Sequence, residues 1–148
     1  MSNMLVHNRK ATFNYEVLEK YMAGIELVGH EVRSLREGKG SLEGSYVIIR
    51  GGEAFLMNSE IPPYQAKNIP KEYDPRRNRK LLLTKKELAL LAGQESKGLT
   101  IVPLAMYNMG RKIKVEIALA KGKKSFDKRE SIKKRESNRD VLRTLKGD

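Results

Sequence analysis

The sequence predicts a mainly β fold with short helices: a closed antiparallel barrel of about six strands, followed by a basic C-terminal tail. Two glycine turns each join a pair of strand-like runs, and six such runs occur in all. After residue 120 the apolar content falls and charged residues dominate. We therefore divide the 148 residues into a folded domain at 1–120 and a tail at 121–148. An open antiparallel sheet is the alternative, because the pattern does not determine strand order.

The first two strands are predicted near the N-terminus. In residues 12–19, Phe13, Tyr15 and Val17 fall on one side of an extended chain, which is typical of a half-buried strand. A second strand is expected to follow Gly24 and to run through residues 25–28.

Two hairpins supply the other four strands. SYVIIR and EAFLMN flank Gly51 and Gly52, which can adopt the positive φ that a two-residue turn requires. LTIVPLAMY and RKIKVEIAL flank a turn that contains Gly110. In the last run, apolar residues alternate with Lys112, Lys114 and Glu116, so one face is predicted to be core and the other wet and mostly basic.

Two helices are predicted between the strands. The first covers residues 31–38, with Gly38 as the residue that ends it. The second begins at Thr84, whose partner Glu87 three residues later completes a capping box, and it ends at Gly93 or Gly98. Residues 60–80 contain four of the five prolines and are predicted to form an irregular loop.

The charge indicates a polyanionic partner. The chain has 30 Lys and Arg against 18 Asp and Glu, a formal charge of +12. The tail alone has eleven cations and five anions, a net +6. An anionic membrane surface is one possible partner, but no apolar run approaches the roughly 20 residues of a spanning helix. With no secretory h-region at the N-terminus, we expect a cytoplasmic protein.

Metal and thiol chemistry are not expected. The chain has no cysteine and only two histidines, so it lacks disulfides, thiolate nucleophiles and the common zinc-ligand sets. No cofactor is therefore predicted. The only local pair for acid-base catalysis is His30 beside Glu31, and neighbouring side chains seldom converge on one reacting atom.

The basic segments have both functional and purely structural explanations. The tail could be a solvated extension, but Glu130 and Lys134 stand at helical spacing, so it could also fold on an RNA surface. Phe126 could stack on an unpaired base or could touch the barrel. A cluster at residues 76–80, close to Tyr64 and Tyr73, could contact RNA or form a solvated loop.

Four blocks occur in an order that resembles the small protein B family, the SsrA-binding proteins. They are GHEVRSL at 29–35, DPRRNRKLLL at 74–83, GLTIVPLAMY at 98–107 and AKGKKSFDKRESIKKRE at 120–136, with NRKA at 8–11 before them. The resemblance spans nearly the whole chain. It implies a closed antiparallel barrel related to the oligonucleotide-binding barrels, without catalytic activity.

The resemblance also implies partners. Members bind the tRNA-like domain of transfer-messenger RNA and bring it to a stalled ribosome in trans-translation, where the tail occupies the decoding centre and the empty mRNA channel. Elongation factor Tu and alanyl-tRNA synthetase are implied only indirectly, through the RNA, and the protein is expected to be a monomer. A generic structured-RNA-binding or ribosomal protein without a rescue role is the competing hypothesis.

The resemblance and the basic clusters together give the expected site residues. Those expected to bind RNA, or to shape the surface that does, are Asn8, Arg9, Lys10, Gly29, Glu31, Val32, Arg33, Ser34, Leu35, Arg79, Lys80, Leu82 and Lys114. Those expected to meet the ribosome are Gly122, Lys123, Lys124, Phe126, Asp127, Lys128, Arg129, Lys133 and Arg135. Packing alone would equally explain Val32, Leu35 and Leu82.

Two positions depart from the family pattern. Phe126 stands where the family often has histidine or another ring, which keeps stacking and gives up a hydrogen bond. Arg33 stands where lysine is more usual, which keeps the charge. We expect Asp127, an acid among cations, to cap the first turn of a tail helix.

Overall fold

The structure, a computed structural model, describes residues 3–64 and 72–123. Its strands are β1 (Asn3–His7), β2 (Tyr15–Ile25), β3 (Tyr46–Arg50), β4 (Glu53–Met57), β5 (Arg79–Leu82), β6 (Thr100–Met109) and β7 (Lys112–Gly122). Its helices are α1 (Arg9–Asn14), α2 (Gly29–Arg36) and α3 (Lys85–Ser96).

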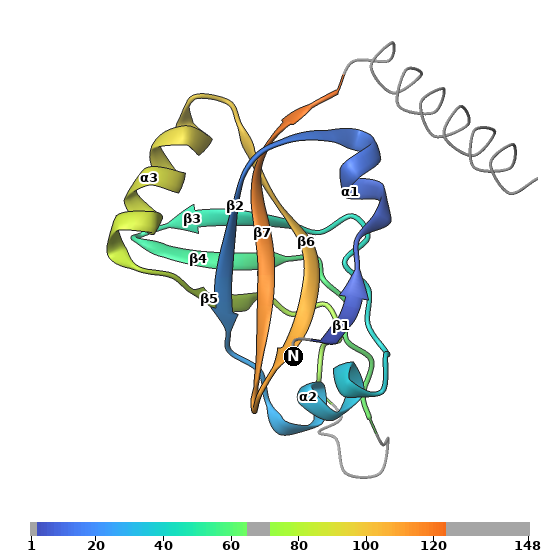
Figure 1. The fold of residues 1–148 in the computed structure, drawn as a ribbon. Coiled ribbons are helices and arrows are strands. Elements are labelled where there is room, and N and C mark those ends of the chain that lie inside the picture. Colours follow the sequence, from blue (N-terminus) through green and yellow to red (C-terminus); the bar gives the residue numbers. More distant parts are fainter. Residues whose placement is uncertain (1–2, 65–71, 124–148) are drawn as a thin grey trace, which may run out of the picture.

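The strands form one antiparallel sheet that closes on itself (Figure 1). Their order is β1-β6-β3-β4-β5-β2-β7, and a further pairing of β6 with β7 joins six of them into a ring. The predicted fold class is thus confirmed. The ring is uneven, because β6 and β7 pair along nearly their whole length while β3 meets β6 at Val47 and Ile101 alone. β1 lies outside the ring, beside β6.

The two glycine hairpins are confirmed. Gly51 and Gly52 join β3 to β4 with φ of 60° and 74°, the pair of positive values that a type I′ turn needs. Gly110 turns β6 into β7 with φ of 64°. The type and length of each turn determine which residues of the two flanking strands lie opposite each other, so the turns also set the strand register.

The other strands differ from the prediction. The two expected at 12–19 and 25–28 are replaced by the single strand β2, because residues 12–14 belong to α1 and Val28 caps α2. β5 lies at the end of the segment predicted as a loop, and β1 was not predicted. The predicted number of six ring strands was therefore right although two of the assignments were wrong. β2 passes the place of the expected break because it pairs with β7 over most of its length.

The core lies inside the ring and is closed at its ends by helices. Leu35 of α2 and Leu91 of α3 are both fully buried and belong to the same cluster as the inward residues of β7, such as Val115 and Ile117. Figure 1 shows α3 beside β3 and α2 at the opposite end. A second, smaller cluster lies between α1 and the outer faces of β6 and β7 and consists of Ala11, Val102, Leu104, Ala118 and Ala120.

The helix ends follow the local signals. α2 begins two residues earlier than predicted, and Gly38, with φ of 78°, ends it as expected. α3 continues past Gly93 and ends before Gly98, whose φ is 94°. No helix within residues 3–64 and 72–123 has the length and apolar character needed to cross a membrane.

The N-terminus of α3 carries the predicted capping box. The Thr84 hydroxyl accepts a hydrogen bond from the Glu87 N–H at 3.1 Å, and the Glu87 carboxylate accepts one from the Thr84 N–H at 3.0 Å. Thr84→Ala is expected to lower the free energy of unfolding by about 1 kcal/mol, because an N–H of the first turn loses its partner. Urea unfolding checks this. Thr12→Ala is the matched control, since the Thr12 hydroxyl only donates to the Arg9 carbonyl, and an equal loss in both variants would contradict the capping role.

Candidate nucleic-acid interface

The predicted RNA-binding residues do not form one continuous patch. Three of them, Val32, Leu82 and Lys114, line a cleft beside α2, which we call the α2 cleft. Asn8 and Lys10 line a second cleft beside α1, which we call the α1 cleft. The others lie elsewhere on the surface or are buried, as described below.

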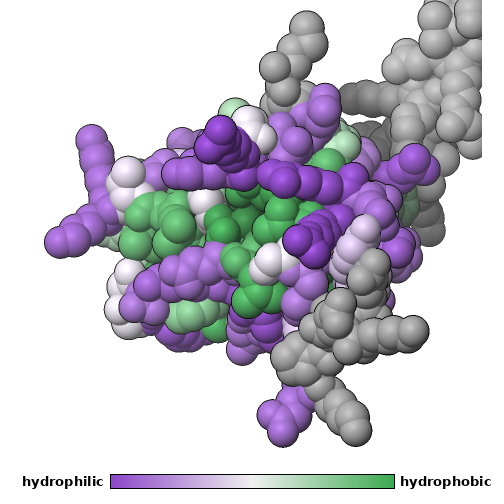
Figure 2. All heavy atoms as spheres, turned by 90° about the horizontal axis from the view of Figure 1, so that it is seen from below, coloured by the Kyte–Doolittle hydropathy of each residue, from purple (hydrophilic) through white to green (hydrophobic). Residues whose placement is uncertain are grey.

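The α2 cleft has an apolar floor and a basic rim. Its volume is about 340 Å³, and the side chains of Ile25, Leu27, Val32, Leu82 and Ile113 share it with the cations Arg111, Lys112 and Lys114. Figure 2 views the molecule from the α2 end and shows hydrophobic residues gathered within a hydrophilic surround. Leu82 is 49% exposed although it belongs to a strand of the ring. Such a surface can take an apolar ring and a phosphate together.

Strand register brings these residues together. Gly24 of β2 pairs with Leu82 of β5 on one side and with Lys114 of β7 on the other. Because Gly24 has no side chain, the space between the Leu82 and Lys114 side chains stays open. A Cβ atom added at Gly24 would lie 3.2 Å from the Leu82 Cβ. The small residue therefore shapes the cleft.

The rim cations are available to a ligand. None of the ion pairs among the described residues involves Arg111, Lys112 or Lys114. The Arg111 carbonyl accepts a hydrogen bond at 3.1 Å from the Arg36 guanidinium, which ties the β6–β7 turn to α2. Arg111 and Lys112 were not among the predicted site residues. Their place at the turn that begins the alternating strand β7 was the signal that could have found them.

Beneath α2 lies a buried charge cluster made of Glu31, Tyr73, Arg77 and Arg79. The Glu31 carboxylate accepts hydrogen bonds from Arg79 at 2.7 and 2.9 Å, from Arg77 at 2.5 and 3.0 Å, and from the Tyr73 hydroxyl at 2.9 Å. The Glu31 and Arg79 side chains have no solvent exposure. Arg79 also donates to the Ser59 carbonyl at 3.0 Å. The cluster holds α2, and so the Val32 wall of the α2 cleft, against β5.

The cluster shifts two pKa values. Burial by itself would raise the pKa of Glu31, but hydrogen bonds from Arg77, then from the Val28 N–H and from Arg79, outweigh it and lower the pKa to about 2. Burial, followed by the hydrogen bond to Glu31, raises the pKa of Tyr73 to about 12. Glu31 is thus an anion near neutral pH, and two guanidinium groups already pair with it.

The burial of several predicted residues alters their expected role. The Glu31, Ser34, Leu35 and Arg79 side chains are fully buried, so they support the surface and offer no group for direct phosphate contact. The expectation that the basic cluster at 76–80 presents Arg79 to RNA is corrected accordingly. A run of cations in sequence indicates charge, whereas burial depends on the fold around it.

The remaining predicted RNA-binding residues lie near the surface. Arg9, Gly29 and Arg33 are exposed. Lys80 is half-buried and lies 3.6 Å from the Glu53 carboxylate.

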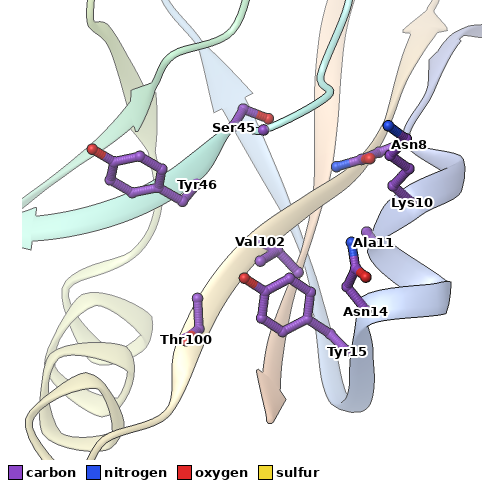
Figure 3. Close-up of a pocket in the computed structure, with 10 residues that line it drawn as sticks. Asn8, Lys10, Ala11, Asn14, Tyr15, Ser45, Tyr46, Thr100 and Val102 are labelled. Atoms are coloured by element: carbon purple, nitrogen blue, oxygen red, sulfur yellow. The ribbon is translucent and has the colours of Figure 1, made fainter. Parts of the chain in front are cut away.

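The α1 cleft lies between α1 and strands β3 and β6. Figure 3 shows Asn8, Lys10 and Asn14 on the α1 side, Tyr46 on the β3 side, and the Tyr15 ring near Val102 between them. The Asn8 side-chain amide donates to the Pro103 carbonyl at 2.9 Å and its backbone N–H to the Leu104 carbonyl at 2.8 Å. Asn8 therefore fastens the start of α1 to β6.

The predicted tail leaves the domain beside α1. β7 continues to Gly122, so the expected tail start at Lys121 falls inside a strand. The Lys123 N–H donates to the Asn14 carbonyl at 2.9 Å, and its Nζ donates to the Thr12 carbonyl at 3.0 Å. The other predicted ribosome-binding residues lie outside the described residues: Lys124, Phe126, Asp127, Lys128, Arg129, Lys133 and Arg135.

Comparison with known proteins identifies the family. A family model described as SmpB protein matches residues 5–147. The chain belongs to the SmpB family. The resemblance of the four sequence blocks is thereby confirmed, and the SmpB match includes both the ring and the tail.

SmpB relatives and a solved SmpB structure agree with this assignment. The chain is 51% identical over 146 residues to an SsrA-binding protein of Gloeothece citriformis (strain PCC 7424), which covers 98% of this chain and 94% of the relative. An SsrA-binding protein of Synechocystis sp. (strain ATCC 27184 / PCC 6803 / Kazusa) is 50% identical over 140 residues, covering 94% and 91%. A solved chain described as “tmRNA-SmpB: a journey to the center of the bacterial ribosome” superposes with a TM-score of 0.67 at 50% identity, covering 80% of this chain and 84% of that chain.

Proposed function

We propose that this protein binds the tRNA-like domain of transfer-messenger RNA and delivers that RNA to stalled ribosomes for trans-translation. The α2 cleft carries the proposal, because it gathers Val32, Leu82 and Lys114 from three separate elements around one open apolar floor. The relatives named SsrA-binding protein, and the solved chain described with both transfer-messenger RNA and the ribosome, support it.

In this proposal the α2 cleft makes two kinds of contact with the RNA, one apolar and one electrostatic. The Leu82 and Val32 side chains contact an apolar base or sugar face, and Lys114, Lys112 and Arg111 contact the phosphates. The phosphate contacts supply most of the affinity, which should then fall steeply as salt rises. The apolar contacts depend on a base that is not paired inside a helix, as in the loops of a tRNA-like fold.

The tail is assigned to the ribosome. Residues 124–148, which follow β7 and Lys123, have nine cations and five anions, a net charge of +4, which suits the rRNA of the decoding centre and the empty mRNA channel. Elongation factor Tu and alanyl-tRNA synthetase meet the protein only through the shared RNA. This work is done in the cytoplasm, where translating ribosomes are found.

We propose binding without catalysis. The only local acid-base pair predicted from sequence was His30 with Glu31. The Glu31 carboxylate is taken up by Arg77, Arg79 and Tyr73, and the His30 ring packs edge-on against Tyr73 with centroids 4.4 Å apart. A carboxylate whose pKa is about 2 is a poor general base near neutral pH.

Lys114→Gln is expected to weaken binding to a transcript of the tRNA-like domain. Loss of one phosphate contact should also make the slope of log affinity against log salt shallower by about 1. Filter binding over a range of salt measures both quantities. Lys97→Gln is the matched control, because Lys97 is an exposed cation that follows α3 and lies outside the α2 cleft. An unchanged slope in the Lys114 variant would remove that residue from the RNA contact.

The competing hypothesis, a generic RNA-binding protein, is tested with the unaltered chain. Its affinity for the tRNA-like domain is compared with that for a tRNA transcript and for an arbitrary RNA hairpin at the same salt concentration. The proposal expects a clear preference for the tRNA-like domain. Equal affinity for all three RNAs would favour the generic function.

A further inference from the structure

The α1 cleft has the composition of a site for a single planar ligand. It has a volume of about 320 Å³, and its walls carry the two phenol rings of Tyr15 and Tyr46, the amides of Asn8 and Asn14, and the ammonium group of Lys10 (Figure 3). From this arrangement we infer that the α1 cleft binds one unpaired RNA base, with Tyr46 stacking on it and Lys10 contacting its phosphate. The inference rests on the proposed RNA-binding function.

The polar groups of the cleft have capacity for a ligand. Among the hydrogen bonds of the described residues, none involves the hydroxyl of Tyr15 or Tyr46, or the side-chain amide of Asn14. Tyr46 is 43% exposed, and its ring lies across the cleft from Asn14, on the β3 side (Figure 3). A base offers ring edges for hydrogen bonds and a face for stacking, so it could meet the polar groups on the α1 side and the Tyr46 ring on the β3 side of the cleft.

Lys10 can reach a phosphate at little cost. It pairs with Glu43 at 2.7 Å, but the two side chains are 66% and 63% exposed, and such surface pairs contribute little stability. Arg9, which is also exposed, precedes it on α1. A phosphate could therefore replace the Glu43 carboxylate as the partner of Lys10 without leaving a buried charge unpaired.

The size of the cleft favours a nucleotide over a larger partner. Ligand pockets range from about 300 to 1,000 Å³, so a cleft of about 320 Å³ lies at the small end of that range, which suits a single base with its sugar. Its lining shares no residue with that of the α2 cleft. It would hold the RNA at a second point, close to Asn14, where the Lys123 N–H fixes the start of the tail.

The chain has no tryptophan, so a single substitution creates a specific reporter. Tyr46→Trp places the only indole at the cleft, and its fluorescence is expected to be quenched when the transcript of the tRNA-like domain is added. Leu90→Trp is the matched control, because Leu90 is 45% exposed on α3 and does not line the cleft. Saturable quenching confined to the Tyr46 variant supports the inference. Equal quenching in both variants, or none in either, overturns it.

The RNA affinity of two further Tyr46 variants separates the contribution of ring stacking from that of the Tyr46 hydroxyl. Tyr46→Ala is expected to weaken binding of the same transcript by about 5- to 150-fold, the range for loss of one stacked base, while Tyr46→Phe keeps most of the affinity. The thermal midpoint of each variant is measured in parallel as the folding control, and affinities are compared at a temperature where both variants are fully folded. Wild-type affinity in Tyr46→Ala, together with weakened binding in Lys114→Gln, overturns this inference and leaves the proposed function standing.

Discussion

A chain that ends after Lys123 is expected to bind transfer-messenger RNA nearly as well as the full chain and to lose peptide tagging on stalled ribosomes. Every residue of the two hydrophobic clusters precedes that position, so the ring should remain folded. Residues 124–148 contain nine cations and five anions, the charge that we assign to the ribosome. Removing them should take away the proposed contact with the decoding centre and leave both clefts intact.

The position of the truncation decides whether the experiment tests the tail alone or also damages the folded domain. Ending the chain at residue 120 would remove Lys121 and Gly122, which pair with Glu16 and Tyr15 at the start of β2. It would also remove the Lys123 N–H that bonds to Asn14. Such a chain could fail through damage to the fold. The cut after Lys123 keeps these contacts, and an unchanged thermal midpoint verifies it.

The measurement is peptide tagging in a reconstituted translation reaction on an mRNA without a stop codon, with RNA binding measured in parallel. Asp127→Asn is a useful companion in the full chain, because asparagine can still cap a helix and should preserve tagging, whereas Asp127→Lys should not. If the shortened chain tags normally but no longer binds the RNA, the two assigned surfaces are reversed.

Local rules explain what the sequence predicted well. The Gly51-Gly52 turn and the Thr84 to Glu87 capping box each depend on residues within four positions of one another. The alternation of apolar and basic residues in β7 likewise depends only on the pleat of one strand. Features of this kind can be predicted because their energies are almost independent of the rest of the fold.

The clefts and the charge cluster could not be predicted in the same way. Gly24 is 58 positions from Leu82 and 90 from Lys114, and only closure of the ring makes them neighbours. Glu31 and Arg79 are 48 positions apart. A basic run in sequence gives no sign that one of its arginines turns inward, because burial depends on where the distant carboxylate lies. Leu82 was predicted as a site residue only from the family resemblance, and a role in core packing would have explained that residue equally well.

Glu31→Gln is expected to be the most destabilising of the proposed substitutions. It leaves Arg79 buried without a counter-charge, and breaking a buried ion pair from one side costs about 3 to 5 kcal/mol. Urea unfolding at neutral pH measures the change. Glu60→Gln is the matched control, because its pair with Arg76 is 44% and 61% exposed and should contribute at most about 1 kcal/mol. Similar losses in both variants would contradict a special role for burial.

The same substitution should change how stability depends on pH. The pKa of Glu31 falls from 4.5 to about 2 on folding, so the carboxylate stabilises the folded state fully above pH 4.5. That contribution is lost as the pH falls from 4.5 toward 2, because the unfolded chain takes up the proton first. In Glu31→Gln the corresponding part of the acid slope should be absent. A slope identical to that of the unaltered chain would mean that Glu31 does not titrate as its pairing requires.

The cluster also links stability to RNA binding. Glu31 and Val32 are adjacent on α2, and Val32 forms a wall of the α2 cleft, so loosening the buried pair should displace that wall. At low temperature, where the variant is still folded, Glu31→Gln is therefore expected to bind the tRNA-like domain more weakly although its side chain touches no RNA. The double variant Glu31→Gln with Arg79→Met removes the unpaired charge and should recover part of the stability. If RNA affinity recovers with it, the cluster acts by positioning α2; if affinity was never lost, the α2 cleft is held by other contacts.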